Sequence, residues 1–185
     1  MWPAGATSNN YRGKYFKLGA DIAFPYDPYE RDDYYENYEA IGGFHGDNFY
    51  NFRGDFDGDN KTVSGIRIRK TEQNLDASNL GLFGGIGAGA NIHDIHLTNA
   101  LITGLNVIGG IVGCFTDQTA IVSGCSVTES EFTMRVPIDG GGVICGFGPQ
   151  NAFLGLIGMQ ADMEAGYNNQ GQENWHESEY FGNDW

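Results

Sequence analysis

Alternating aspartates give the chain its clearest candidate for metal chemistry. Asp55, Asp57 and Asp59 stand two residues apart, as ligands do at the start of a calcium-binding loop. An EF-hand also needs Gly at its sixth position and Glu at its twelfth, and these positions are Asn60 and Ile66 here. The sequence therefore excludes an EF-hand. Two interpretations stay open: a looser calcium site, or a turn in which the carboxylates accept hydrogen bonds from nearby backbone N–H groups.

The histidines do not form a known metal-binding pattern. The run from His176 begins like the helix of a zinc peptidase, but Tyr180 stands where the second histidine is required. His93 and His96 are three residues apart, which predicts opposite faces of a strand, so we do not expect them to share a metal. His45 stands alone. We interpret all of these as surface or loop histidines and expect no metal and no cofactor.

Catalytic constellations are absent from the sequence. No Gly-rich phosphate loop with its lysine and no nucleophile elbow occurs. Glycoside hydrolysis needs two carboxylates about 5–9.5 Å apart, and adjacent coils of a repeat fold could bring two acidic residues that close. The outward positions that we predict below form no carboxylate ladder. We therefore expect a protein that is not an enzyme and has no catalytic residues.

The elements that would position these side chains follow an internal repeat. Between Gly54 and Met159 a pattern of apolar, two residues, apolar, one residue, apolar occurs four times. Successive copies are 29, 30 and 32 residues apart, and periods in this range are typical of solenoids and other repeat arrays. The copies are Val63-Ile66-Ile68, Ile92-Ile95-Leu97, Val122-Cys125-Val127 and Leu154-Ile157-Met159.

Each repeat reads as short strands that are separated by glycine-rich turns. Side chains two apart share one face of a strand, so the last two apolar residues of each copy should point inward. Arg67, His96 and Ser126, which lie between them, should point to solvent. A single repeat cannot bury its apolar face, but stacked repeats can, with strands pairing in parallel. The predicted fold is all-β: a short right-handed parallel β-helix of about four to five coils with an irregular C-terminal tail.

The glycine-rich motifs resemble those of a known family. The run from Phe52 to Ile68, together with Gly81-Leu82-Phe83-Gly84 and Gly110-Ile111-Val112-Gly113, resembles bacterial surface proteins with GLUG-motif repeats. Residues 15–22 resemble the strand that precedes the first repeat, whereas Cys145 stands where a motif glycine is expected. The resemblance implies a β-helix in a secreted or surface-anchored protein, often an adhesin, and implies no catalytic residue.

Composition narrows the class of partner. The 185 residues fit one domain, and the formal charge of −14 argues against nucleic acid and anionic membrane as partners. No run of 18 apolar residues and no signal peptide occurs, so the extracellular or cell-surface location is implied by the resemblance alone. We expect a segment of a larger exported protein. Cys114, Cys125 and Cys145 read as buried free thiols, with one bridge between Cys114 and Cys145 left open.

We divide the chain into a β-helix domain, residues 1–159, and a polar and aromatic tail, residues 160–185, which is either a cap or unstructured. An insertion at 25–40 mixes tyrosines with acidic residues. Tyrosine is enriched at interfaces, so this loop is the candidate binding surface for a host glycan or an extracellular protein. The alternative is that its rings only cover the flank of the fold. The candidate binding residues are Tyr29, Tyr34, Tyr35 and Tyr38.

Three functions are compatible with this sequence. The first is a non-enzymatic surface module that acts as an adhesin segment or scaffold. The second is a β-helix that binds or processes glycans, which a cleft with paired carboxylates would favour. The third is a spacer within an exported peptidase, which a longer reading frame with a zinc-peptidase motif would favour.

Overall fold

The regular secondary structure in the described part of the chain is almost entirely β-strand. The computed structural model describes residues 10–25, 36–45, 48–70, 75–134, 141–142, 145–147 and 160–163. Within these ranges there is no α-helix, only one short 3-10 turn, Leu75–Ala77, and nearly all strand pairs are parallel. The all-β class and the predominance of parallel strands therefore agree with the prediction.

The strands follow one another in sets of similar length. Two short strands and an antiparallel hairpin come first: β1 (Tyr15–Lys17), β2 (Ile22–Ala23), β3 (Gly43–His45) and β4 (Asn48–Tyr50). The next set is β5 (Asp55–Ser64), β6 (Arg67–Arg69), β7 (Ser78–Leu80) and β8 (Phe83–Ile86). The third is β9 (Asn91–Thr98), β10 (Leu101–Gly104), β11 (Asn106–Gly109) and β12 (Val112–Phe115). The last comprises β13 (Ile121–Ser123), β14 (Ser126–Met134), β15 (Gly141–Gly142) and β16 (Cys145–Phe147), followed by β17 (Gln160–Met163).

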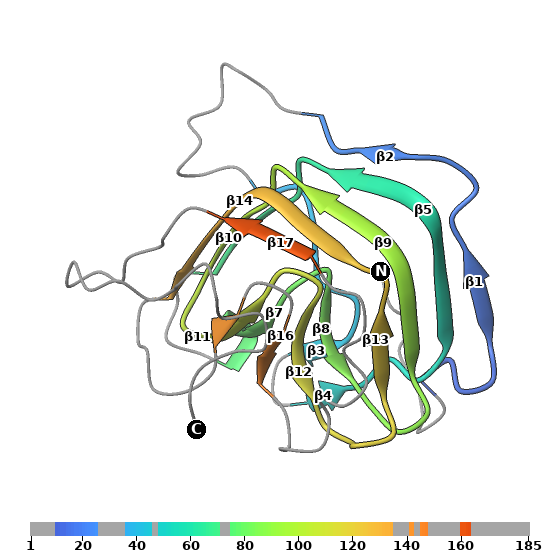
Figure 1. The fold of residues 1–185 in the computed structure, drawn as a ribbon. Helices are drawn as coiled ribbons and strands as arrows, with labels where there is room; N and C mark the ends of the chain where they lie inside the picture. The colour runs from blue at the N-terminus through green and yellow to red at the C-terminus, as the bar shows by residue number, and fades with distance from the viewer. Residues whose placement is uncertain are drawn as a thin grey trace.

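Corresponding strands of successive sets pair with one another. The largest sheet has nine strands, in which β1, β5, β9 and β14 lie side by side, as Figure 1 shows. The first half of β14 pairs with β9 and its second half pairs with β10, so this sheet continues through β10 to β6. Two three-stranded parallel sheets, β7-β11-β15 and β8-β12-β16, complete the described structure beside the hairpin.

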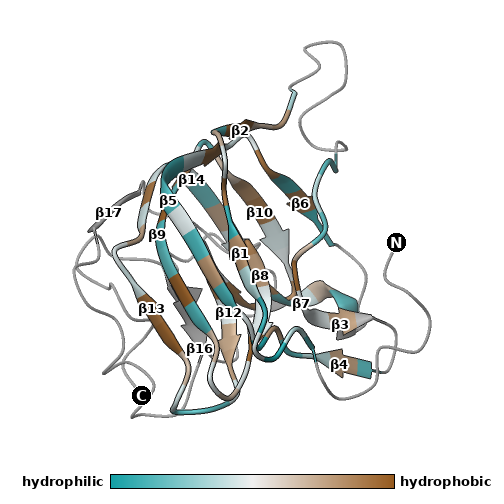
Figure 2. Ribbon diagram, turned by 90° about the vertical axis from the view of Figure 1, so that its right-hand side faces the viewer, coloured by the Kyte–Doolittle hydropathy of each residue, from teal (hydrophilic) through white to brown (hydrophobic). Residues whose placement is uncertain are grey.

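The register confirms part of the predicted alignment. Leu97 lies opposite Val127, and Ile92 lies opposite Val122, so the second and third copies of the apolar pattern are aligned with an offset of 30 residues. Buried side chains alternate with more exposed ones along β9 and β14, except at His93–Asp94 and Thr128–Glu129, and Figure 2 shows a matching alternation in hydropathy. Both strands therefore present one apolar face to the core, as the pattern predicts.

The first and fourth copies of the predicted alignment are wrong. Val63, not Ile68, lies opposite Leu97, and Ile68 lies opposite Ile102. This repeat is longer than the apolar spacing suggests. A bulge in β5, where Gly58–Asn60 stand opposite one residue of β9, adds two residues, and the connection from β6 to β7 adds six, because Arg69 lies opposite Thr103 (offset 34) whereas Ser78 lies opposite Asn106 (offset 28). At the other end Ala161 lies opposite Val127, the place predicted for Met159; the residues of the fourth copy, Leu154, Ile157 and Met159, all lie outside the described residues.

The core runs continuously through the stacked strands. The inward residues of the two well-aligned copies are all buried, with at most 1% of their surface exposed. Phe52 and Phe83 pack together with ring centroids 5.2 Å apart, and Phe56 packs edge-on against Phe83. The largest fully buried side chains are Phe83, Phe115, Phe132, Ile66, Ile68, Ile86, Ile92, Ile95, Leu97, Ile102 and Ile108.

Corners of the fold recur at equivalent positions with positive φ. Ser64, Thr98 and Thr128 lie opposite one another on neighbouring strands. The residues that follow them, Gly65, Asn99 and Glu129, have φ of 75°, 50° and 50°. Asn79 and Val107, with φ of 57° and 54°, form a second such pair between β7 and β11. A left-handed residue at the same place in successive repeats turns each strand away from the preceding one in the same direction.

The glycine-rich motifs coincide in space. Phe83 lies opposite Val112, which places Gly84 opposite Gly113, and a side chain at Gly84 would collide with the carbonyl oxygens of Gly42 and Asn79. These glycines are required because neighbouring backbones approach too closely for a Cβ atom.

The third motif is aligned differently from the prediction. Cys145 lies opposite Val112, not opposite Gly113, and Phe147 lies opposite Cys114. Gly146 therefore takes the position equivalent to Gly113, so the glycine expected at Cys145 is present one residue later.

Two of the cysteines are buried free thiols. Cys114 and Cys125 are unpaired, and Cys125 takes the core position equivalent to Ile95. Burial raises the pKa of Cys125 to about 12 and that of Cys114 to about 11. Both are therefore protonated at neutral pH and pack as small apolar side chains.

No helix among the described residues is both long and apolar enough to cross a membrane.

Candidate functional site

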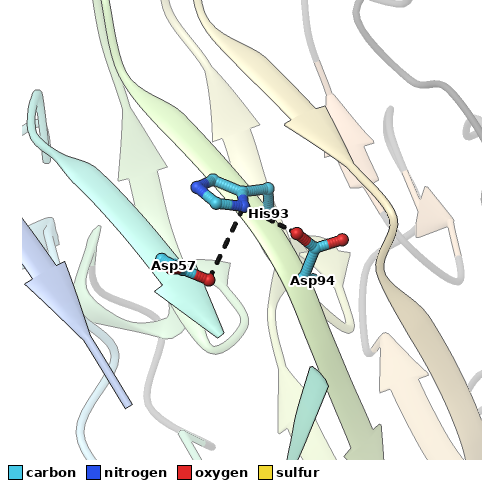
Figure 3. A group of neighbouring side chains, drawn as sticks. All are labelled: Asp57, His93 and Asp94. Atoms are coloured by element: carbon cyan, nitrogen blue, oxygen red, sulfur yellow. Dashed lines mark hydrogen bonds and ion pairs between the residues drawn. The ribbon is translucent and has the colours of Figure 1, made fainter. Parts of the chain in front are cut away.

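A cluster of carboxylates surrounds one histidine on the outer face of β5 and β9. Asp57 lies opposite His93, because the two strands are paired in parallel at this point. Phe56 and Ile92, the neighbours of these residues, face the core, so the side chains of Asp57 and His93 face outward. Asp55 from β5 and Asp94 from β9 complete the His93 cluster, which we define as Asp55, Asp57, His93 and Asp94. Figure 3 shows three of its members.

His93 is held between carboxylates on both sides of its ring. Its Nδ1 atom lies 2.9 Å from Oδ2 of Asp94 and 3.8 Å from Oδ1 of Asp57. Its Nε2 atom lies 3.3 Å from Oδ1 of Asp55. Partial burial disfavours the imidazolium, but the hydrogen bonds with Asp94 and Asp55 and the charge of Asp57 outweigh it and raise the pKa of His93.

Asp57 is the least exposed acid of the cluster. Its side chain is 13% exposed, and it accepts hydrogen bonds from the Tyr15 hydroxyl at 2.6 Å and from the Asp59 backbone N–H at 2.7 Å. Lys17 lies 3.3 Å from Oδ2. These donors lower the pKa of Asp57 to about 2, so it is ionised at neutral pH.

The backbone at Asp94 sets the geometry of the cluster. Asp94 has φ of 55°, and it is the single residue that faces the β5 bulge. Its Oδ1 atom occupies the space that a side chain at Gly124 would need, and a side chain at Gly58 would collide with its carbonyl oxygen. The two glycines therefore leave room for Asp94 to turn its carboxylate toward His93.

The prediction that His93 and His96 lie on opposite faces is wrong. Both are half-exposed on the outer side, and His96 Nδ1 lies 2.7 Å from the Ser126 hydroxyl. The left-handed conformation of Asp94 interrupts the alternation, so that His93 and Asp94 are both outward before Ile95 returns to the core. The two histidine rings nevertheless have different partners, Asp94 for His93 and Ser126 for His96. Among the described residues, the group of possible metal ligands contains His93 but not His96.

The alternating aspartates do not converge on one point. Asp57 contacts His93 and Tyr15, whereas Asp59 is paired with Lys17 at 2.7 Å and with Lys61 at 3.5 Å. Asp55 accepts a hydrogen bond from the side chain of Asn91. The hydrogen bond from the Asp59 backbone to Asp57 matches the turn interpretation. Asp55 and Asp57 both contact His93, and Lys17 contacts both Asp57 and Asp59, so no single partner is shared by all three carboxylates.

One of the four candidate tyrosines lies in the described part of the chain. Tyr38 packs edge-on against Phe24 with ring centroids 5.3 Å apart, and its hydroxyl donates to the carbonyl oxygen of Leu82 at 2.9 Å. Burial raises its pKa. Tyr38 therefore covers the apolar flank of the fold. Tyr29, Tyr34 and Tyr35 lie outside the described residues, so their role in binding stays a prediction.

The end of the insertion is fixed to the strand stack by hydrogen bonds. Asn37 donates from its side chain to the Gly65 carbonyl and accepts from the Arg67 backbone N–H, at 2.9 and 2.7 Å. Glu36 accepts from the Arg69 backbone N–H at 2.8 Å and lies 3.4 Å from Lys70. These contacts anchor Glu36 and Asn37 along β6.

The His93 cluster could not be found from the sequence because β5 is further from β9 along the chain than the apolar pattern suggests. Asp57 and His93 are 36 residues apart, whereas the apolar pattern suggested an offset of 29. The available signal was the pair of outward motifs, Asp-x-Asp and His-Asp, which only the correct register brings together.

Comparison with known proteins gave no relative from which a function could be transferred. Neither family models, curated proteins nor solved structures gave a match. The resemblance to surface proteins with GLUG-motif repeats therefore stays a prediction.

Proposed function

We propose that the chain is a short right-handed parallel β-helix of about four to five coils. On this proposal it acts as a non-enzymatic surface or secreted module, an adhesin-like or scaffold segment of a larger bacterial protein. The observation that carries it is the stacking of equivalent strands in register: His96 lies opposite both Thr62 and Ser126, and Ile102 lies opposite both Ile68 and Phe132. Repeats that stack in this way form a rigid and extended support for loops.

The glycine-rich motifs support the same proposal. Gly81-Leu82-Phe83-Gly84 and Gly110-Ile111-Val112-Gly113 occupy equivalent positions, since Phe83 lies opposite Val112. Gly84 and Gly113 each lie too close to a neighbouring backbone for a side chain. A motif that repeats along the chain for such a reason is expected in a family that is defined by the motif. The proposal places recognition on loops, because the inward side chains of the strands are used in the core.

The test is binding without turnover. The chain, immobilised through a terminal tag, is screened against a glycan array and a panel of extracellular matrix proteins, and the same ligands are followed for cleavage. We expect saturable binding of at least one ligand and no cleavage product. Deletion of residues 27–35, which keeps the anchoring contacts of Glu36, Asn37 and Tyr38, should abolish binding and leave the circular dichroism spectrum unchanged. Cleavage that is lost when one acidic pair is replaced would contradict the non-enzymatic function.

A cavity supports glycan binding as the second candidate function. It has a volume of about 180 Å³ and combines carboxylates and an amide with an aromatic ring, groups that bind sugar hydroxyls and the apolar face of a sugar. Replacement of Glu39 and Asp76 by Gln and Asn should then remove glycan binding, while loss only on deletion of residues 27–35 would favour the loop. Its lining residues are Glu39, Ala40, Gly42, Phe44, Ile68, Lys70, Asp76, Ser78, Asn79 and Leu80.

A further inference from the structure

We propose that the His93 cluster binds one divalent transition-metal ion of the Zn²⁺ type, with His93 Nδ1, one oxygen of Asp94 and one oxygen of Asp57 as ligands. This inference does not depend on the proposed surface function. The sequence alone led us to expect no metal, and the pairing of β5 with β9 is the observation that changes this expectation.

The ligand atoms have the spacing that such an ion needs. His93 Nδ1 lies 2.9 Å from Asp94 Oδ2 and 3.8 Å from Asp57 Oδ1, and one ligand atom from each of the three residues lies within 4.8 Å of the others. Ligands at about 2.0–2.2 Å from a zinc ion are roughly 3–3.6 Å apart, so shifts of a few tenths of an ångström to about 1 Å would complete the set. Two carboxylates and an imidazole hold three positions and leave the outer side for water.

The surroundings are arranged as metal sites require. Asp55 faces the other ring nitrogen of His93, Nε2, at 3.3 Å, so its carboxylate would orient the ring when Nδ1 coordinates the ion. A separate observation points to the same place: Gly124 lacks the Cβ atom that would displace the Asp94 carboxylate from its position. Lys17 and the Tyr15 hydroxyl contact Oδ2 of Asp57, whereas Oδ1 accepts the Asp59 backbone N–H and lies 3.8 Å from His93 Nδ1.

The donor set selects the class of ion. Imidazole nitrogen favours zinc, copper, nickel and iron over calcium and magnesium, which prefer oxygen ligands. The candidate calcium ligand Asp59 is paired with Lys17 and Lys61 and takes no part. We therefore expect Zn²⁺ to bind, and Ca²⁺ at the same concentration not to compete with it.

The experiment is a calorimetric titration of the full chain, after removal of metal with EDTA, with Zn²⁺ and separately with Ca²⁺. We expect one equivalent of Zn²⁺ to bind. His93→Gln should weaken binding at least 100-fold, Asp94→Asn should weaken it at least tenfold, and Asp55→Asn should weaken it by about 10–100-fold as an outer partner of the histidine. The matched control is His96→Gln on the same strand and the same outer side, which should bind as the unaltered chain does.

A second measurement on the unaltered chain keeps the test independent of how the variants fold. NMR of the histidine ring nitrogens should show that Zn²⁺ shifts the His93 resonances and leaves those of His96 in place. The proposal is overturned if no saturable Zn²⁺ binding occurs, if folded His93→Gln binds as tightly as the unaltered chain, or if the shifted resonances belong to another histidine.

Discussion

The carboxylate of Asp94 lies against Gly124, in the space that a side chain at this position would fill. Ser123 lies opposite His93 and Ser126 lies opposite His96. Asp94 and Gly124 are therefore at neighbouring places in successive repeats. Both have positive φ, 55° and 61°. The small residue in one repeat thus makes room for the polar side chain of the repeat before it, and the outward His93 cluster depends on this contact.

Gly124→Ala should therefore cost more stability than an alanine at another left-handed glycine. Gly89, with φ of 75° and no atom within 4 Å of an added Cβ, is the matched control. Gly89→Ala should cost about 1–2 kcal/mol through backbone strain alone. Gly124→Ala adds the collision with Asp94 and should cost more, measured by urea unfolding.

The same comparison in an Asp94→Gly background separates the two causes. Asp94→Gly removes the carboxylate and suits the positive φ, so the excess cost of Gly124→Ala should disappear. Equal costs for Gly124→Ala and Gly89→Ala in the unaltered chain would show that the Asp94 contact contributes nothing.

Replacement of Ile95 by Asp should destabilise the fold strongly, whereas His96→Asp should be tolerated. Ile95 is fully buried, and an unpaired carboxylate there costs several kcal/mol out of a total stability of about 5–15 kcal/mol. His96 is half-exposed and would lose one hydrogen bond to Ser126, about 1 kcal/mol or less. Thermal unfolding of the two variants checks this, and similar melting temperatures would contradict the inward and outward assignment.

Acid should remove the stabilisation that Asp57 provides. The pKa of Asp57 is lowered to about 2, below its unfolded value of about 4, by the hydrogen bonds from the Tyr15 hydroxyl and the Asp59 backbone and by the nearby Lys17. The contribution is thus fully present above about pH 4 and is lost as the pH falls toward 2. In EDTA, Asp57→Asn should lower the melting temperature at pH 6 and flatten its decline between pH 4 and pH 2.

The control for the acid experiment is Glu131→Gln, an exposed carboxylate on β14. This variant should keep the full decline of the melting temperature between pH 4 and pH 2. If Asp57→Asn shows the same decline as Glu131→Gln, the donors around Asp57 do not stabilise its charged form.

The sequence was sufficient to predict which strand residues lie opposite one another where one repeat matches the next without insertion. Ile92, Ile95 and Leu97 align with the copy that begins at Val122 because no residue is added between them. It was insufficient in the first repeat, where the bulge at Gly58–Asn60 adds two residues and the connection from β6 to β7 adds six, because neither addition changes the apolar pattern itself. Apolar periodicity identifies which side chains are buried but does not fix which residue of the next strand lies opposite.

The candidate site shows the same limit. Each member of the His93 cluster is a common surface residue, and the Asp-x-Asp and His-Asp motifs can be connected only when the offset of 36 residues between their strands is known. The role of Tyr38 also depends on tertiary contacts. The tyrosines and acidic residues around it in the sequence predicted binding, whereas its ring packs against Phe24 and its hydroxyl donates to Leu82.

The most direct test of the account is a disulfide between successive repeats. Thr98 on β9 and Thr128 on β14 are paired residues whose hydroxyl oxygens lie 3.2 Å apart, within reach of a disulfide if both become cysteine. In a chain with Cys114, Cys125 and Cys145 replaced by alanine, Thr98→Cys/Thr128→Cys should form this bond nearly completely under mild oxidation, as mapped by mass spectrometry of proteolytic peptides. Thr98→Cys/Ser126→Cys, shifted by one outward position, should remain reduced; a bond in the shifted pair, or none in the registered pair, would contradict the stacked arrangement.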